Sequence, residues 1–294
     1  MKPHIGFVGI GNMGSPMARR VLGGDYSLTV FDVDLDRMKQ FASMNGCRAA
    51  ATPAELGRHV DIVITMLPNG HVVREAVLGT DGVAAGLRSG GILVDMSSAD
   101  AAGTRELGAE LALRGIAVAD APVSGGVGGA AAGTLSIMVG GEDDAVFRRI
   151  EPILQTMGTK LFRAGPLGAG HAAKALNNLM GALSMLGCAE VLLISRQFGL
   201  DPAKIFEIIN ASTGRSSGTE SMAKRLPDPT RPLGFALALM AKDVKLASDL
   251  ARDLKIEAPI AAAAQRILAD ACDKLGPADV AETIHYLEKI SGRP

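Results

Sequence analysis

The first half of the chain alternates short apolar runs with longer segments whose apolar residues recur at helical spacing. Near-continuous apolar runs are typical of strands that helices cover on both faces, and periodic segments such as 34–44 and 101–113 predict helices. The expected strands are 4–8, 27–31, 62–66, 92–95, 116–119, 135–139 and 160–162. This alternation predicts an α/β fold with a doubly wound, mostly parallel sheet over residues 1–163.

The pattern changes near residue 165, and no convincing strand follows. A long helix is expected from about 168 to 198, with Gly199 in a position typical of the residue after a helix. Asp201 and Pro202 then predict the N-cap and first position of the next helix. Further helices are expected over 235–254, 259–274 and 277–290, and a loop over 212–233, which is rich in Ser, Gly, Thr and Pro. Residues 164–294 are therefore predicted to form an all-α C-terminal domain, joined to the first by the long interdomain helix.

Charge and composition exclude several partners. The formal net charge is −1 and the chain has no Trp, so the sequence indicates neither a basic field nor stacking platforms for nucleic acid. The start of the chain lacks the pattern of a signal peptide. The longest uncharged apolar run, about 175–189, is shorter than the ~20 residues of a membrane span. We therefore expect a cytoplasmic protein that binds neither nucleic acid nor membrane.

The three cysteines and five histidines form no motif with metal-ligand spacing. Cys47, Cys188 and Cys272 are far apart, which favours small apolar roles in a reducing compartment. No metal is expected.

A glycine-rich turn directly follows the first expected strand. It has the form GxGxxG and leads into a helical pattern. The first glycine permits a tight turn, the second lets backbone approach a pyrophosphate, and the third lets helix and sheet pack closely. A turn without a ligand would show the same glycines, but an acidic residue, Asp32, closes the next strand at the expected distance. The pattern predicts a Rossmann-type dinucleotide site.

Asp32 also bears on which dinucleotide is bound. A carboxylate there accepts hydrogen bonds from the adenosine ribose and repels a 2′-phosphate, which favours NAD over NADP. The next basic residue, Arg37, lies inside the following helix. Leu67 and Pro68, at the end of the third strand expected in this sheet, either flank the cofactor or merely end that strand. The expected cofactor contacts from these segments are Gly9, Ile10, Gly11, Asn12, Met13, Gly14, Asp32, Leu67 and Pro68.

Two further segments carry candidate chemistry. Ser124, Gly125 and Gly126 follow another apolar strand, where open backbone amides and a hydroxyl suit a substrate carboxylate, although a flexible loop would have the same composition. Lys174 stands among Ala, Gly and Leu residues on the long helix, four positions before Asn178. A free lysine has a pKa near ~10.4, and burial beside a cationic ring lowers it toward the range of a general base. A solvated lysine is the alternative.

The chain resembles the β-hydroxyacid dehydrogenases over essentially its whole length. The matching segments are GIGNMGSPMA, ITMLP, DAPVSGGVGGAAAGTLSIMVGG, GAGHAAKALNN and LMAKDVKLA, in the order and spacing of that family. Within it the chain is most similar to 3-hydroxyisobutyrate dehydrogenase and its relatives, which share a 6-phosphogluconate dehydrogenase-like organisation. The resemblance implies a helical domain that builds a homodimer or homotetramer interface.

The resemblance also implies roles for individual residues. Lys174 takes the position of the catalytic lysine, with Asn178 as its hydrogen-bonding neighbour. Ser124, Gly125 and Gly126 take that of the loop that binds the substrate carboxylate. The remaining carried-over positions are Ser98, on the nicotinamide side and near substrate, Lys242, which reaches cofactor and substrate, and Asp243 beside it.

Two departures from the family pattern put the substrate in doubt. His171 stands where many relatives have Gln, which leaves the hydrogen bonding around Lys174 open. The loop 211–217 lacks the aromatic continuation associated with hydroxyisobutyrate enzymes. Its Arg215 either binds a second anionic group or is a solvated charge, and the second interpretation is slightly favoured.

The sequence thus predicts an oxidoreductase that transfers a hydride between NAD and a small, 3-hydroxyisobutyrate-like hydroxy acid, with Lys174 as general acid and base. One alternative is an NADP-dependent reductase of tartronate or succinic semialdehyde type. Another is a non-catalytic protein that binds the cofactor. Imine reductases share the architecture but usually lack the lysine, so Lys174 weighs against them.

Overall fold

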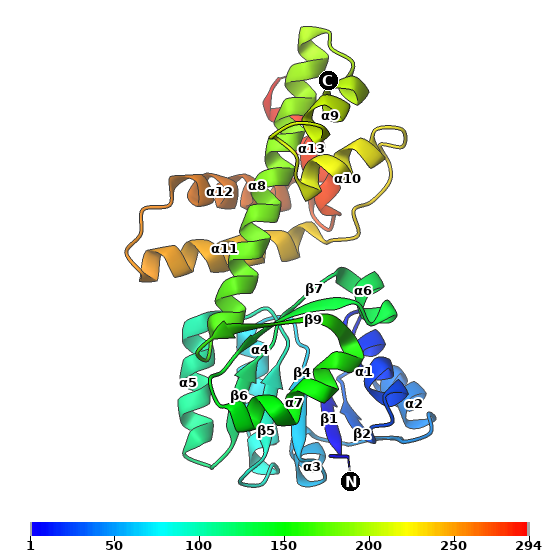
Figure 1. Cartoon of the computed structure of the whole chain (residues 1–294), viewed down its shortest axis with the longest axis vertical. Coiled ribbons are helices and arrows are strands. Elements are labelled where there is room, and N and C mark those ends of the chain that lie inside the picture. The colour runs from blue at the N-terminus through cyan, green and yellow to red at the C-terminus, as the bar shows by residue number, and fades with distance from the viewer. Residues whose placement is uncertain (1, 293–294) are drawn as a thin grey trace. The chain divides into compact units, whose positions relative to one another are not determined.

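A twisted sheet, parallel over most of its width, organises the first part of the chain in the computed structural model, which describes residues 2–292 (Figure 1). The chain folds into two compact units, which divide between Lys174 and Ala175. Within the described residues the strands follow the order β3-β2-β1-β4-β5-β6-β8-β7, and β9 also pairs with β8. The strands are β1 (Ile5–Val8), β2 (Leu28–Phe31), β3 (Cys47–Ala49), β4 (Ile62–Thr65), β5 (Ile92–Asp95), β6 (Ala117–Asp120), β7 (Val123–Ser124), β8 (Leu135–Gly140) and β9 (Gly158–Gly165).

Pairing is parallel from β3 across to β6, whereas β8 runs antiparallel to β6 and β7. The predicted α/β class, with its doubly wound sheet, is confirmed. All seven expected strands are present, but the short β3 and β7 were missed because runs of three and two residues show no resolvable periodicity.

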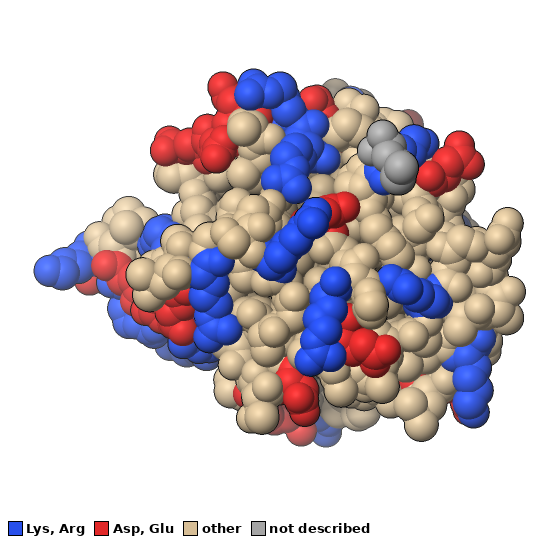
Figure 2. All heavy atoms as spheres, turned by 90° about the horizontal axis from the view of Figure 1, so that it is seen from below, with Lys and Arg blue, Asp and Glu red and all other residues tan. Residues whose placement is uncertain are grey.

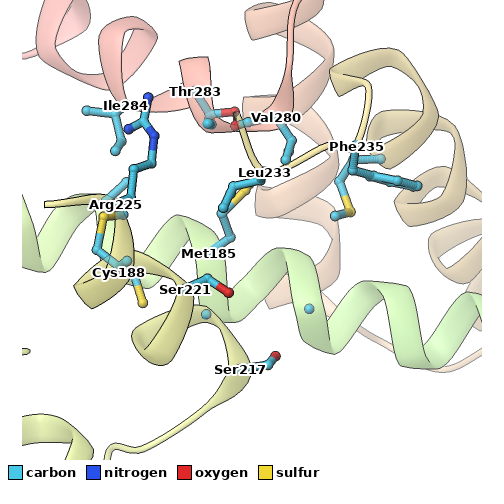
Figure 3. A pocket seen from close by; sticks show the side chains of 16 residues that line it. Met185, Cys188, Ser217, Ser221, Arg225, Leu233, Phe235, Val280, Thr283 and Ile284 are labelled. Carbon is cyan, nitrogen blue, oxygen red and sulfur yellow. Dashed lines mark hydrogen bonds between the residues drawn. The ribbon is translucent and has the colours of Figure 1, made fainter. Parts of the chain in front are cut away.

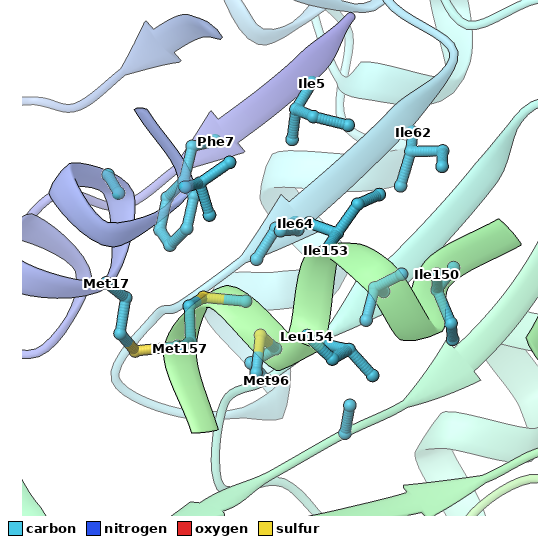
Figure 4. Close-up of a cluster of buried hydrophobic side chains, with 14 of the residues drawn as sticks. Ile5, Phe7, Met17, Ile62, Ile64, Met96, Ile150, Ile153, Leu154 and Met157 are labelled. Atoms are coloured by element: carbon cyan, nitrogen blue, oxygen red, sulfur yellow. The ribbon is translucent and has the colours of Figure 1, made fainter. Parts of the chain in front are cut away.

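Helices cover both faces of the sheet. Alternate strand residues enter different cores, so that Ile62 and Ile64 pack on one face and Val63 on the other. On the first face, α7 contributes Ile153 and Met157 to a cluster that fills the space beneath β1 and β4 (Figure 4). The helices of this unit are α1 (Gly14–Gly23), α2 (Leu35–Ala42), α3 (Pro53–Arg58), α4 (Gly70–Leu78), α5 (Ala101–Ala112), α6 (Gly126–Ala132) and α7 (Asp144–Met157).

The second unit is helical, as predicted. Asp201 caps α9 by accepting a hydrogen bond from Ala203 N, and Pro202 occupies the first turn. Phe206, Leu237 and Leu268 are fully buried in its core. The helices from this point are α8 (Ala169–Phe198), which begins in the first unit, α9 (Pro202–Asn210), α10 (Ser217–Arg225), α11 (Leu237–Asp253), α12 (Pro259–Leu275) and α13 (Thr283–Ile290).

The expectation of a continuous loop over 212–233 is wrong. Helix α10 lies within it and begins with a capping box, in which Ser216 and Thr219 exchange hydrogen bonds between side chains and backbone amides. The Ser, Gly and Thr residues that suggested a loop are thus partly helix-capping residues. The expected helix 277–290 is also shorter, because Ala236 and Asp279 form an isolated bridge and a 3₁₀ turn, Val280–Glu282, precedes α13.

By length and composition alone, α8 could cross a membrane: it is 30 residues long with a mean hydropathy of 1.6 over its most apolar window. The short uncharged run at 175–189 is therefore not a decisive argument against a membrane span. Ala182, Leu186 and Leu192 of α8 pack in the core of the helical unit. Core helices of soluble proteins have this same composition, and packing accounts for the apolar character of these positions.

Candidate active site

The carboxyl ends of the parallel strands bring several predicted residues to one edge of the sheet. The turns after β1, β2, β4, β5 and β6 all leave at that edge because the strands share a direction. Strand order reverses between β1 and β4, and ligands of such sheets bind in the crevice at that point. The glycine turn, Asp32, Leu67 and Ser98 follow these strand ends.

The glycine turn has the geometry that a dinucleotide needs. Gly9 has a φ of +93°, and a Cβ there would lie 2.4 Å from the Met66 carbonyl oxygen. A Cβ on Gly14 would lie 1.9 Å from the Gly9 carbonyl oxygen, so the turn closes only if both residues are glycine. At Gly11 the nearest atom to a Cβ would be the end of the flexible Arg37 side chain, at 3.3 Å. Backbone at Gly11 is therefore open to a ligand.

Helix α1 starts directly after this turn, and Met13 at its N-cap offers no side-chain hydrogen bond. The first turn of α1 also contains no acidic residue. Its amide groups and helix dipole are thus available to a pyrophosphate. The residues fit a nicotinamide dinucleotide.

Asp32 ties the glycine turn to the end of β2. One carboxylate oxygen accepts a hydrogen bond from Ile10 N at 2.7 Å, and the other accepts from Asp34 N at 2.9 Å. Each oxygen retains a further lone pair for a ribose hydroxyl. Arg37 pairs with Asp34 at 3.0 Å, and its guanidinium lies beside Gly11. The positive charge of Arg37 is therefore closer to the glycine turn than its position inside α2 indicated.

The turns after β4 and β5 are joined by a hydrogen bond. Leu67 N donates to the hydroxyl of Ser97 at 2.9 Å, and Ser97 is fully buried. Ser98 is half-buried directly after it, and Pro68 is exposed beside Leu67. This hydrogen bond holds the turn that contains Leu67 against the turn that contains Ser98 at the same edge of the sheet.

The segment from Ser124 to Gly126 is ordered rather than a flexible loop. Ser124 ends β7 opposite Ser136, and α6 begins at Gly126. Gly125 and Gly126 have φ values of +134° and +63°, which favour glycine. Both glycines are exposed, so their backbone amides are accessible to a carboxylate.

Lys174 is buried, with 8% of its surface exposed, in the second turn of α8. Asn178 follows four residues later on the same helix, the spacing that places two residues on one helix face. The interpretation of Lys174 as an ordinary solvated lysine is wrong. A lysine is rarely buried to this extent unless its charge is paired.

Sequence reasoning missed a cluster of polar residues one helical turn before Lys174. The ring of His171 lies among Asp95, Asp120 and Thr104, all four of them buried. The available signal was that Asp95 and Asp120 each end an apolar strand. Their position in one buried row depends on strand order, which the sequence does not specify.

In the helical unit, Asn178, Lys242 and Asp243 come together. The amide nitrogen of Asn178 donates to the Asp243 carboxylate at 2.5 Å, and Lys242 Nζ lies 3.1 Å from its other oxygen. Asp243 is 3% exposed. This carboxylate fixes the Asn178 side chain, a contact that links α8 to α11.

The helical unit also contains a pocket with mainly apolar walls (Figure 3). The buried Arg225 lines it, but its guanidinium already contacts Glu282 and the Arg231 carbonyl oxygen. None of the predicted site residues lines this pocket. It is therefore distinct from the predicted catalytic residues.

No other cluster competes as a reaction centre among residues 2–292. No group of three His, Cys, Asp or Glu side chains there can hold a metal ion. Burial raises the pKa of the Cys47 thiol to about 11 and also raises the pKa of Cys188 and Cys272. Little thiolate is therefore present at neutral pH. Basic and acidic side chains are interspersed on the face shown in Figure 2.

The matches to known proteins cover both units. Residues 4–165 match the NAD binding domain of 6-phosphogluconate dehydrogenase, and residues 168–287 match the NAD-binding domain of NADP-dependent 3-hydroxyisobutyrate dehydrogenase. The chain is 38% identical to the human mitochondrial 3-hydroxyisobutyrate dehydrogenase over 280 residues, covering 93% of this chain and 83% of the human one. The chain belongs to the 3-hydroxyisobutyrate dehydrogenase family.

Two other relatives show the range of this family. The 2-(hydroxymethyl)glutarate dehydrogenase of Eubacterium barkeri is 36% identical over 98% of this chain and 96% of its own. The structure of Mycobacterium tuberculosis 3-hydroxyisobutyrate dehydrogenase with L-serine superposes with a TM-score of 0.90 at 34% identity, covering 98% of this chain and 99% of that one. Membership makes this protein an NAD(P)-dependent hydroxyacid dehydrogenase.

We predict that Gly14→Ala weakens NADH binding at least about tenfold while the protein stays folded, because the added Cβ pushes the turn open at Gly9. The enhancement of NADH fluorescence on binding measures this affinity. Gly23→Ala, at the other end of α1, is the matched control because its Cβ would meet no atom within 4 Å. Equal affinity in both variants would contradict the role of the turn.

Proposed function

We propose that this dehydrogenase catalyses reversible NAD-dependent oxidation of a small acid whose alcohol lies close to its carboxylate, with Lys174 as the general acid and base. The observation that carries the proposal is the burial of Lys174 in the family motif GAGHAAKALNN, four residues before Asn178. An amine shielded from water is suited to exchanging a proton with an alcohol, because burial disfavours its charged form.

The names of the three relatives point to one substrate class. 3-Hydroxyisobutyrate, 2-(hydroxymethyl)glutarate and L-serine each have a hydroxymethyl group on the carbon that bears the carboxylate. They differ only in the third substituent of that carbon. We infer that this protein acts on the same class, 3-hydroxypropanoates substituted at carbon 2.

In the proposed reaction the substrate carboxylate binds the open amides and hydroxyl of Ser124, Gly125 and Gly126. Neutral Lys174 takes the hydroxyl proton as the alcohol becomes an aldehyde, and returns it in the reverse direction. NAD, which the glycine turn and Asp32 would hold, would supply the acceptor for the hydride of the hydroxymethyl carbon. Asn178, whose side chain Asp243 holds, would position Lys174, and Ser98 and Lys242 would contact substrate and nicotinamide.

Replacing Lys174 by Ala is expected to lower turnover by ~10²-fold or more, because the proton has no acceptor, and to leave NADH affinity nearly unchanged. Steady-state rates with hydroxyisobutyrate and NADH titration measure the two effects. Lys160→Ala, at an exposed lysine of β9, is the control. Near-normal turnover without Lys174 would remove it from the mechanism. Absence of turnover in the wild type with every acid tested would favour a non-catalytic binding protein.

We propose NAD rather than NADP as the preferred cofactor because Asp32 ends β2 beside the glycine turn. Its negative charge repels a 2′-phosphate and accepts from the ribose. Two observations favour the alternative, an NADP-dependent semialdehyde reductase: Arg37 lies beside Gly11, and residues 168–287 match a domain of an NADP-dependent dehydrogenase.

For the wild type we expect kcat/KM to be higher with NAD than with NADP by at least about tenfold. Asp32→Asn should reduce this ratio, since an amide still accepts from Ile10 N but does not repel phosphate. Asp36→Asn, at an exposed residue of α2 paired with Lys39, controls for net charge. A wild type that prefers NADP would overturn the assignment.

We further propose that the protein forms a homodimer or homotetramer in the cytoplasm. Leu176, Met180, Ile194 and Phe198 are 49%, 66%, 67% and 80% exposed, and their spacing places them on a single face of α8. Gly187 lies at the middle of this apolar stripe, and a Cβ there would meet no atom within 4 Å. An exposed stripe of this kind suits a second copy of the chain.

Met180→Asp together with Phe198→Asp is expected to convert the oligomer to a monomer, because charges would be buried at the interface. Light scattering coupled to gel filtration measures the mass. Leu113→Asp, an 89% exposed position on the other unit, should leave the oligomer intact. A monomeric wild type at micromolar concentration would exclude this interface.

A further inference from the structure

Two buried aspartates lie side by side on neighbouring strands. Asp95 ends β5 and Asp120 ends β6, and the two residues are paired in the parallel register. They are 2% and 0% exposed. Two adjacent carboxylates withdrawn from water repel each other unless a proton or a cation compensates their charge.

Uncharged groups donate hydrogen bonds to both carboxylates. One oxygen of Asp95 accepts from the Thr65 hydroxyl at 2.8 Å and from Ser97 N at 3.0 Å. The two oxygens of Asp120 accept from Gly168 N and His171 N, each at 2.7 Å. These bonds orient the carboxylates but leave both negative charges in the core.

The imidazole of His171 lies close to both aspartates. Its Nε2 lies 3.6 Å from Asp95 Oδ2, its Nδ1 lies 3.8 Å from Asp120 Oδ2, and its side chain is completely buried. Lys174 lies one turn further along α8. Thr104, from α5, is the remaining polar neighbour, at 2.8 Å from Nδ1.

The surroundings of the His171 imidazole favour a proton on each of its two ring nitrogens. The Thr104 hydroxyl donates its single proton to the Asp100 carbonyl oxygen at 2.8 Å, since a carbonyl only accepts. Towards Nδ1 the hydroxyl must therefore accept, and Nδ1 donates. The buried Nε2 has no hydrogen-bond partner and lies 3.6 Å from Asp95 Oδ2, so without a proton its lone pair would be close to a carboxylate, and the favourable state has a proton there too.

We infer that His171 is a buried imidazolium that compensates Asp95 and Asp120, and that it is a positioning residue for Lys174. The ring of His171 anchors the first turn of α8 to β5, β6 and α5. Lys174 follows one turn later on the same helix. The second half of this inference rests on the proposed function, whereas the first half does not.

The charge state is tested by ¹⁵N NMR of the full-length protein labelled in its five histidines. At about pH 8, where a free imidazole is neutral, one histidine should keep the signals of an imidazolium, and these should vanish in His171→Gln. Asp95→Asn should remove these imidazolium signals at the same pH. A neutral tautomer of His171 at pH 8 in the wild type would overturn the inference, as would an imidazolium that Asp95→Asn leaves unchanged.

The positioning role is tested by turnover in His171→Gln and His171→Leu. We expect kcat to fall about tenfold in the Gln variant and further in the Leu variant, with KM for NAD nearly unchanged, because the lysine is displaced rather than removed. Equal kcat in all three proteins would refute positioning. If Lys174→Ala also left turnover intact, the proposed function itself would fail, while the NMR result would stand.

Discussion

The parallel alignment of β3, β2, β1, β4, β5 and β6 is the constraint on which the rest of the first unit depends. Parallel strands need a crossover between each pair, and the crossovers place helices on both faces. Every one of these strands therefore enters its turn at the same edge. This shared direction brings the glycine turn after β1 and the aspartates that end β5 and β6 to the same edge, although they are far apart in the sequence.

Much of the fold could be predicted from the sequence because long periodic segments have few alternatives. The strand positions and the apolar α8 are local patterns, and the caps at Asp34 and Asp201 are short-range hydrogen bonds that local residue types indicate. The 212–233 segment shows the limit. Its Ser216 and Thr219 are favoured both in loops and at helix starts, and the burial of Met222 in the core of the helical unit favours the helix.

Some features of the candidate site could likewise be predicted from the sequence, and others could not. The glycine turn and Asp32 could be found because each function needs a particular residue at a fixed local distance. The burial of Lys174, the bond from Asn178 to Asp243 and the aspartate row could not, because each joins segments that only the folded sheet or helix bundle brings together. Arg37 is a clear case: six residues after Phe31 in the sequence, it lies beside Gly11 in space.

The glycines at the start of α8 have a consequence for the order of folding. A Cβ at Gly170 would lie 2.2 Å from the Met138 carbonyl oxygen and 2.7 Å from an Asp120 carboxylate oxygen, so the first turn is packed directly against β6 and β8. Glycine is a poor helix former, and this turn has little tendency to nucleate in isolation. It becomes ordered as β6 and β8 assemble, because the carboxylate of Asp120 on β6 then accepts hydrogen bonds from the amides of Gly168 and His171. Strands β6 and β8 must therefore be in place before the start of α8, and Lys174 in its second turn, becomes ordered.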